Sequence, residues 1–242
     1  MGVDGEYRPL VRLACLLALL WTGAAQAAGC RLALALALDV SASVDADEYD
    51  LQRLGLAAAL DSPQVRAAIL RGAPGQVALA VYEWSGHHQQ KLHLDWTMLT
   101  GEAAIDRAVA LLAAMARSHD DFPTSVGQAL GYGATLLERG PDCARRVIDL
   151  SGDGVNNYGF RPANAYRHFP FTEVVVNGLV ILGDDPEVLR FYQSEVLHGT
   201  GAFLVTADGF ADFRAAMTRK LLREIGEVAV GAAPAARRWP RG

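Results

Sequence analysis

Residues 32–49 read LALALALDVSASVDADEY, and this stretch decides the fold class. Every position from Leu32 to Leu38 is apolar, which is typical of a strand that helices cover on both faces of a parallel sheet. Asp45 stands three residues before Glu48, a capping-box pattern that indicates the start of a helix. The stretch therefore predicts a central strand followed by a polar turn and a helix.

Strand-like apolar runs alternate with longer helical patterns along the rest of the chain, as in βαβ units. Strands are expected at residues 31–39, 76–84, 89–97, 145–151, 174–182 and 202–206. Helices are expected at residues 45–60, 101–116, 125–139, 162–169, 185–197 and 208–226. Only SGHH, residues 85–88, joins the second and third strands, which favours an antiparallel hairpin at one edge of the sheet. We predict an α/β fold, a Rossmann-like three-layer α/β/α sandwich whose six-stranded, mostly parallel sheet has one antiparallel edge strand.

The first 27 residues have the pattern of a secretory signal peptide. Arg8 and Arg12 precede an apolar run that ends at Trp21, and the small residues Ala25 and Ala27 follow. The apolar run is shorter than the roughly 20 residues that a membrane-spanning helix needs. We expect export to the periplasm or the exterior, one domain at residues 28–226 and a flexible tail at residues 227–242.

The charge balance argues against nucleic acid as a partner. The chain has 27 acidic and 22 basic residues, and its net charge of −5 persists without the first 27 residues, which contain two of each kind. Nucleic-acid binding depends on basic patches that displace counterions. The length fits a single domain with a substantial core.

Removal of the leader would leave two cysteines, Cys30 and Cys143, in an oxidising compartment, where an even pair favours a disulfide. Cys30 lies nine residues before Asp39 and Cys143 lies ten before Asp153, so both would begin adjacent parallel strands at nearly the same level. The alternatives are two unpaired buried thiols, or a lipid anchor on Cys30, because AAGC resembles a lipobox that lacks its usual aliphatic residue.

Oxygen-bearing side chains follow the first strand at alternate positions. Asp39, Ser41 and Ser43 can point three oxygens at one place, and the carboxyl ends of parallel strands form the ligand crevice of open α/β sheets. Thr124 stands just before a predicted helix, and Asp153 follows a second buried strand between two glycines. Carboxylates and hydroxyls suit a small, hard divalent cation.

The combination of DVSAS, Thr124 and SGDG resembles the metal-ion-dependent adhesion site (MIDAS) of von Willebrand factor type A domains. The resemblance implies that Ser41, Ser43 and Thr124 coordinate Mg²⁺ or Mn²⁺, while Asp39 and Asp153 balance charge through water. It also implies that a carboxylate from a partner protein completes the coordination. Many relatives have a second threonine where this chain has Val126, from which we expect a small loss of support and an intact site.

A narrower resemblance is carried by YEWSG, by RRVIDLSGDGVNN and by AFLVTADGFADFRAAMTRKLLREI. These segments are similar to those of a bacterial family of exported type A-like proteins that is known only as a domain of unknown function, of the DUF1194 type. This resemblance implies a fold and a site, and it names no partner.

Two other classes of function remain open. A hydrolase could use the same cation as a Lewis acid, but it needs a positioned nucleophile or base, and no convincing His or Cys follows the strands. A structural module could use the cation only to stabilise its loops. We expect a binding module rather than an enzyme.

Several polar residues near the motifs have simpler explanations. Asp39 could cap a helix, and the serines could form turns. Asp149 lies inside a predicted strand and is expected to pair with Arg145 or Arg146.

Six other side chains could serve a ligand or only the local structure. His87 and His88 fit a solvated turn better than a second metal site. Glu83 and Trp84 could line the rim of the cleft or pack. Asn156 and Asn157 could contact a ligand or shape the backbone of their turn.

Overall fold

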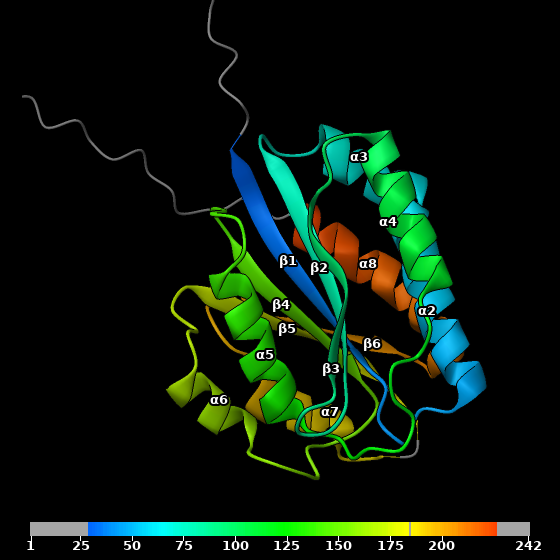
Figure 1. Ribbon diagram of the computed structural model, residues 1–242, viewed down its shortest axis with the longest axis vertical. Helices are drawn as coiled ribbons and strands as arrows, with labels where there is room; N and C mark the ends of the chain where they lie inside the picture. The colour runs from blue at the N-terminus through cyan, green and yellow to red at the C-terminus, as the bar shows by residue number, and fades with distance from the viewer. Residues whose placement is uncertain (1–28, 184, 227–242) are drawn as a thin grey trace, which may run out of the picture.

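The structure, a computed structural model, describes residues 29–183 and 185–226. Its sheet has the strand order β3-β2-β1-β4-β5-β6 (Figure 1). The strands are β1 (Cys30–Asp39), β2 (Gln76–Trp84), β3 (Gln90–Met98), β4 (Arg146–Gly152), β5 (Val174–Ile181) and β6 (Leu204–Ala207). Only β3 is antiparallel to its neighbour among these pairings, so the predicted fold class and the antiparallel edge strand are confirmed.

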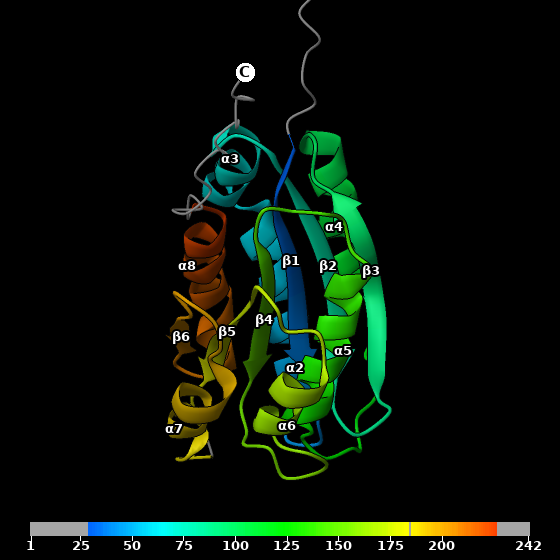
Figure 2. The same ribbon diagram turned by 90° about the vertical axis from the view of Figure 1, so that its left-hand side faces the viewer.

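Helices cover both faces of the sheet (Figures 1 and 2). One face carries α2 (Ala46–Asp61), α3 (Pro63–Arg71), α4 (Glu102–Ala114) and α8 (Phe213–Gly226). The other face carries α5 (Val126–Glu138), α6 (Pro162–His168), α7 (Val188–Phe191) and the π-helical turn η1 (Tyr192–Val196). A 3₁₀ turn, η2 (Phe210–Asp212), precedes α8. The central strand is therefore buried on both faces, as its unbroken apolar run predicts.

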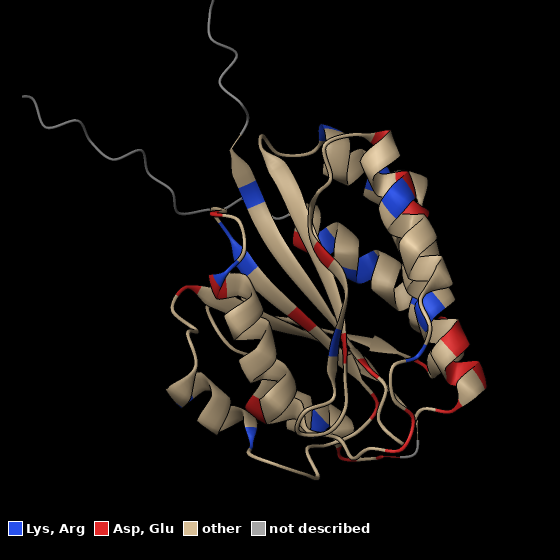
Figure 3. Ribbon diagram, in the orientation of Figure 1, with Lys and Arg blue, Asp and Glu red and all other residues tan. Residues whose placement is uncertain are grey.

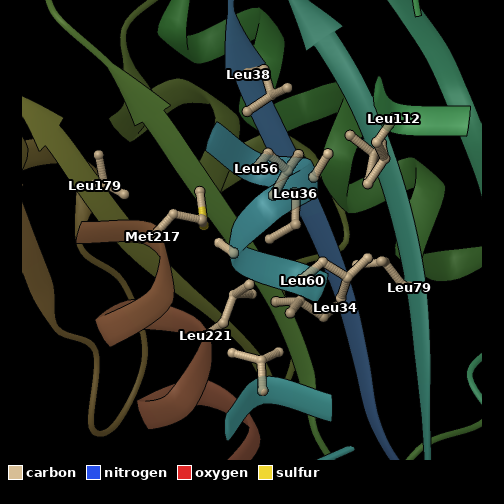
Figure 4. Packing of buried hydrophobic residues seen from close by; sticks show 14 of the residues in the cluster. Leu34, Leu36, Leu38, Leu56, Leu60, Leu79, Leu112, Leu179, Met217 and Leu221 are labelled. Carbon is tan, nitrogen blue, oxygen red and sulfur yellow. The ribbon is translucent and has the colours of Figure 1, made fainter. Parts of the chain in front are cut away.

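The alternation of leucine and alanine in β1 assigns one residue type to each face. The leucines belong to the core cluster that includes Leu56 and Leu60 of α2 and Met217 and Leu221 of α8 (Figure 4). The alanines face α5 in the second cluster. Their small side chains let α5 lie close to the sheet: a Cβ on Gly133 would lie only 2.6 Å from Tyr82 Oη. Close packing thus explains a glycine that weakens the helical pattern of the sequence.

Two helical regions differ from their predictions. The segment Pro63–Arg71 forms α3, which was not predicted, although Ser62 accepts a hydrogen bond from the Val65 amide at 3.4 Å and Pro63 opens the helix. The helix expected at 185–197 is instead the short α7 followed by η1. Its first residues form a turn in which Asp185 Oδ1 accepts a hydrogen bond from the Glu187 amide at 2.9 Å.

The predicted disulfide joins Cys30 to Cys143, and their Cα atoms lie 4.5 Å apart. The two residues also form a parallel bridge at the amino ends of β1 and β4. The bond therefore links neighbouring strands at the end opposite the acidic cluster, as the spacing predicted. It also occupies the Cys30 sulfur that a lipid anchor would need.

The predicted partner of Asp149 is wrong. Its carboxylate lies 3.2 Å from the ammonium of Lys220 on α8 rather than beside Arg145 or Arg146, and both groups are fully buried. Lys220 Nζ also lies 3.3 Å from Glu224 Oε1, while Arg145 Nη1 donates to the Glu224 carbonyl at 2.8 Å. Burial raises the pKa of Asp149 to about 7, against the lowering influence of Lys220. A buried charge cluster therefore attaches α8 to β4.

None of the helices within residues 29–183 and 185–226 has the length and apolar character needed to cross a bilayer. The predicted signal peptide at 1–27 and the predicted tail at 227–242 lie outside the described residues.

The disulfide should contribute substantially to stability, because it closes a loop with a sequence separation of 113 residues. We expect replacement of both Cys30 and Cys143 by serine to lower the free energy of unfolding by about 2–4 kcal/mol, as measured by urea denaturation. Dithiothreitol should destabilise the wild-type protein to the same extent and leave the double variant unchanged. An unchanged wild-type midpoint in dithiothreitol would contradict the prediction.

Candidate metal centre

The five predicted site residues come from three segments that meet at one edge of the sheet. Asp39 ends β1, and Asp153 follows β4, which pairs directly with β1. Thr124 stands two residues before α5. The chain places β2 on one side of β1 and β4 on the other, so the strand order reverses at this point. Open α/β sheets form their ligand crevices at such a reversal, outside the carboxyl ends of the strands.

Hydrogen bonds connect the five side chains into one group. Ser43 Oγ donates to Asp153 Oδ1 at 2.9 Å, and Ser41 Oγ lies 3.2 Å from Ser43 Oγ. Thr124 Oγ1 donates to Ser41 Oγ at 3.2 Å, and the Ser41 amide donates to Asp39 Oδ1 at 2.8 Å. The structure thus brings together all five residues, which are up to 114 positions apart in the sequence.

The carboxylate of Asp39 is buried close to a second carboxylate, which makes its negative charge unfavourable. It is 0% exposed, and its Oδ2 atom has no hydrogen-bond partner among the described residues. Burial, and then the nearby charge of Asp153, raises the pKa of Asp39 to about 8. A buried, incompletely satisfied carboxylate beside a second carboxylate and three hydroxyls is a donor set that fits a hard divalent cation.

The first glycine of SGDG, Gly152, has no room for a side chain. A Cβ on Gly152 would lie 2.7 Å from Asp39 Oδ2 and 2.6 Å from Tyr192 Oη. A Cβ on Gly154, the second glycine, would lie no closer than 3.7 Å to Thr124 Oγ1. The first glycine therefore leaves room for the Asp39 carboxylate.

Arg117 holds the loop between β1 and α2 and was missed by the sequence analysis. Its Nη2 donates to the carbonyls of Val40, Ser41 and Val44 at 3.2, 3.1 and 2.7 Å. The side chains of this loop point their oxygens at the site, and one guanidinium satisfies carbonyls of the same loop. An arginine in an irregular segment carries no motif, so only its proximity to Thr124 in the sequence could have indicated this role.

Glu83 fixes the segment that contains Arg117. Its carboxylate accepts hydrogen bonds from the Tyr49 hydroxyl at 2.7 Å and the Ser118 amide at 2.8 Å, and His93 Nε2 lies 3.0 Å away. Although burial acts to raise the pKa of Glu83, these contacts outweigh it and lower the pKa. Both Glu83 and Trp84 are 0% exposed, so the suggestion that they line the rim is wrong and the packing alternative holds.

Asn156 and Asn157 shape the loop that follows β4. Asn157 Oδ1 accepts a hydrogen bond from the Thr124 amide at 2.9 Å, and the Asn157 amide donates to the Thr124 carbonyl at 3.0 Å. Asn156 Oδ1 accepts from the Gly127 amide in the first turn of α5 at 3.1 Å. The two side chains therefore position Thr124 against the Asp153 loop.

The His and Cys side chains of the described residues do not form a metal site beside these oxygens. His87 and His88 contact each other in the exposed turn between β2 and β3. Among the described residues, no group of three or more His, Cys, Asp or Glu side chains could hold a metal ion. The candidate centre depends instead on hydroxyl oxygens beside two carboxylates. Val126, which replaces the second threonine, is the first residue of α5 and is buried in the second core cluster.

Solved structures with the same fold have low sequence identity to this chain. The proximal thread matrix protein 1 from the mussel byssus, solved with a zinc-occupied MIDAS motif, has a TM-score of 0.62 and 15% identity over 83% of this chain and 49% of its own. A von Willebrand factor type A protein from Catenulispora acidiphila has a TM-score of 0.58 and 15% identity, covering 82% of this chain and 43% of its own. The pilus adhesin SpaC from Lactobacillus rhamnosus GG, in its open conformation, has a TM-score of 0.58 and 14% identity, and the match covers 81% of this chain and 30% of SpaC.

The chain thus has the fold of a von Willebrand factor type A domain, and it spans about half the length of the mussel protein. A comparison with curated protein sequences finds no match. Residues 29–229 match the family described as "Protein of unknown function (DUF1194)", and the chain belongs to this family.

The buried charge of Asp39 should make the metal-free protein less stable as the pH rises. Because the folded protein holds this proton up to about pH 8 and the unfolded chain releases it near pH 4, the associated stability is full below pH 4 and lost through pH 8. We expect Asp39→Asn, measured by urea denaturation in EDTA at pH 8.5, to be about 1–3 kcal/mol more stable than wild type.

The difference between the two proteins should shrink toward pH 4, and the titration of Asp149 should cancel because both proteins retain it. A variant that is less stable than wild type at pH 8.5 would contradict the assignment of strain to Asp39.

Proposed function

We propose that this protein is an exported protein-binding module of the adhesion type, which captures an acidic group of a partner through a MIDAS-like divalent cation site. Ser41, Ser43 and Thr124 would hold Mg²⁺ or Mn²⁺, and Asp39 and Asp153 would balance its charge. The single observation that carries the proposal is the convergence of these five side chains around a buried carboxylate that lacks a hydrogen-bond partner among the described residues.

The chemistry of the donor set explains why a carboxylate would bind. Hydroxyl ligands are neutral, so a cation held by Ser41, Ser43 and Thr124 keeps a strong attraction for a negative oxygen. When bound, the cation supplies one positive charge centre at the edge of the sheet. A carboxylate from a partner would complete both its coordination and its charge.

Two further observations support an extracytoplasmic binding role. The Cys30–Cys143 disulfide suits an oxidising compartment such as the periplasm or the exterior. The structural neighbours include a byssus matrix protein, a pilus adhesin and the PilB minor pilin from Streptococcus sanguinis, and none of these descriptions names an enzyme.

The first test replaces one hydroxyl and changes little else. Thr124→Val removes the donor oxygen from a side chain that is 4% exposed, while the backbone hydrogen bonds to Asn157 stay in place. In calorimetric titrations, we expect wild type to bind Mg²⁺ or Mn²⁺ and Thr124→Val to bind it at least about ten-fold more weakly. Thr135→Val on α5 is the matched control and should behave as wild type.

Capture of partners is tested with the same proteins immobilised in Mg²⁺ or EDTA and exposed to a periplasmic and extracellular extract. Wild type and Thr135→Val should retain the same proteins in Mg²⁺ and lose them in EDTA, and Thr124→Val should retain none of them. Equal recovery by all three proteins, or metal-dependent hydrolysis of a phosphoester panel that Asp39→Ala abolishes, would overturn the proposal.

Arg117 should determine the affinity for the cation without contacting it. Arg117→Met keeps the length of the side chain but leaves the loop carbonyls of Val40, Ser41 and Val44 without their guanidinium. We expect the Kd for Mg²⁺, measured by calorimetry, to rise about ten-fold or more. Arg107→Met, on the exposed face of α4, should leave the Kd unchanged, and equal Kd values for the two variants would contradict this role.

A further inference from the structure

A cavity of about 300 Å³ opens beside the candidate metal centre. Its wall includes three of the five site residues, Ser43, Thr124 and Asp153, and it continues to the loops that follow β5 and β6. A carboxylate of a partner that binds at the metal centre would therefore place the adjoining part of the partner at the mouth of this cavity. The volume suits one side chain of a partner rather than a large ligand.

The cavity combines an apolar wall with carboxylates. Val155, Leu182 and Phe210 supply apolar surface, and Glu48 and Asp185 add acidic groups to that of Asp153. No Lys, Arg or His from the described part of the chain lines it. The lining therefore fits a side chain that has an apolar stem and a positive end.

The two additional carboxylates are held by neutral donors. Glu48 Oε2 accepts from the Asp45 amide at 2.9 Å, in the capping box of α2. Asp185 Oδ2 accepts from the Val155 amide at 3.1 Å. Within residues 29–183 and 185–226, neither carboxylate forms an ion pair with a basic side chain.

This charge distribution restricts which acidic partner could bind. Figure 3 shows acidic segments in red along the loops at the carboxyl edge of the sheet. One divalent cation attracts a carboxylate, but Glu48 and Asp185 repel any further negative charge that accompanies it. A strongly acidic partner surface is therefore disfavoured at this edge.

We propose, building on the binding function above, that the partner presents its carboxylate next to a Lys or Arg side chain and that this side chain enters the cavity. The aliphatic stem packs against Val155, Leu182 and Phe210, and the cationic end lies near Glu48 and Asp185. The cation selects the carboxylate, and the cavity selects its basic neighbour.

The probe is a set of glycine-rich peptides immobilised densely on beads, each with one Asp. The residue on either side of the Asp is Lys, Arg, Leu or Glu, and a further peptide carries Lys beside Asn in place of Asp. Retention of the full protein is measured in Mg²⁺ and in EDTA, after Mg²⁺ loading has been verified by calorimetry. Dense display compensates for the weak binding of single short peptides.

Three variants separate the cavity from general charge effects. Glu48→Gln removes a charge and keeps an acceptor for the capping box, and Asp185→Asn removes the other charge. Glu138→Gln makes the same chemical change at the last residue of α5, whose first residue lies near the site, so it is about 18 Å away. Only the first two changes should affect the choice of peptide.

We expect wild type and Glu138→Gln to retain the Lys-Asp and Arg-Asp peptides about ten-fold better than the Glu-Asp peptides in Mg²⁺. Glu48→Gln and Asp185→Asn should each reduce this preference several-fold at a Mg²⁺ concentration that saturates all four proteins. Equal, Mg²⁺-dependent retention of all the Asp peptides would overturn the role of the cavity and leave the proposed function standing. Retention of the Lys-Asn peptide, retention in EDTA, or no retention at all would overturn both.

Discussion

The constraint on which this structure depends is a carboxylate that the fold withdraws from water at the end of its central strand. Asp39 is buried as completely as the leucines before it, yet one of its oxygens has no hydrogen-bond partner among the described residues. An ionised group in that position is costly unless a positive charge compensates it. The neighbouring loops place three hydroxyls and a second carboxylate beside Asp39. Gly152 has no side chain and so leaves room for the Asp39 carboxylate.

The fold could be predicted because its information is local and periodic. The run of alternating leucine and alanine from Leu32 to Leu38 specifies a strand buried on both faces, and the structure places each residue type on its own face. The spacing of Cys30 and Cys143 from their strand ends predicted their pairing for the same reason, since residues in parallel strands advance at equal rates. The five oxygen-bearing residues of the candidate site were predicted from the resemblance of DVSAS, Thr124 and SGDG to a known metal-site motif, and the structure brings their side chains together.

What the sequence did not predict are contacts made by long side chains across the molecule. Arg117 reaches carbonyls more than 70 positions earlier, and Lys220 reaches Asp149 across a similar separation. Neither contact has a sequence period, because a flexible side chain can reach any group that the fold brings near. The predicted pairing of Asp149 with a nearby arginine failed for this reason. Arg146 is three positions away in the strand, so its side chain points to the opposite face, and Arg145 lies before the strand begins.

The buried ammonium of Lys220 holds α8 in place against the sheet. It lies between Asp149 on the sheet and Glu224 on its own helix, with all three groups shielded from solvent. Sliding α8 along β4 would separate opposite charges in a medium that cannot screen them, at a cost of about 3–5 kcal/mol. Under the proposed function, partner binding would therefore be controlled by occupancy of the cation site rather than by a shift of α8 along the sheet.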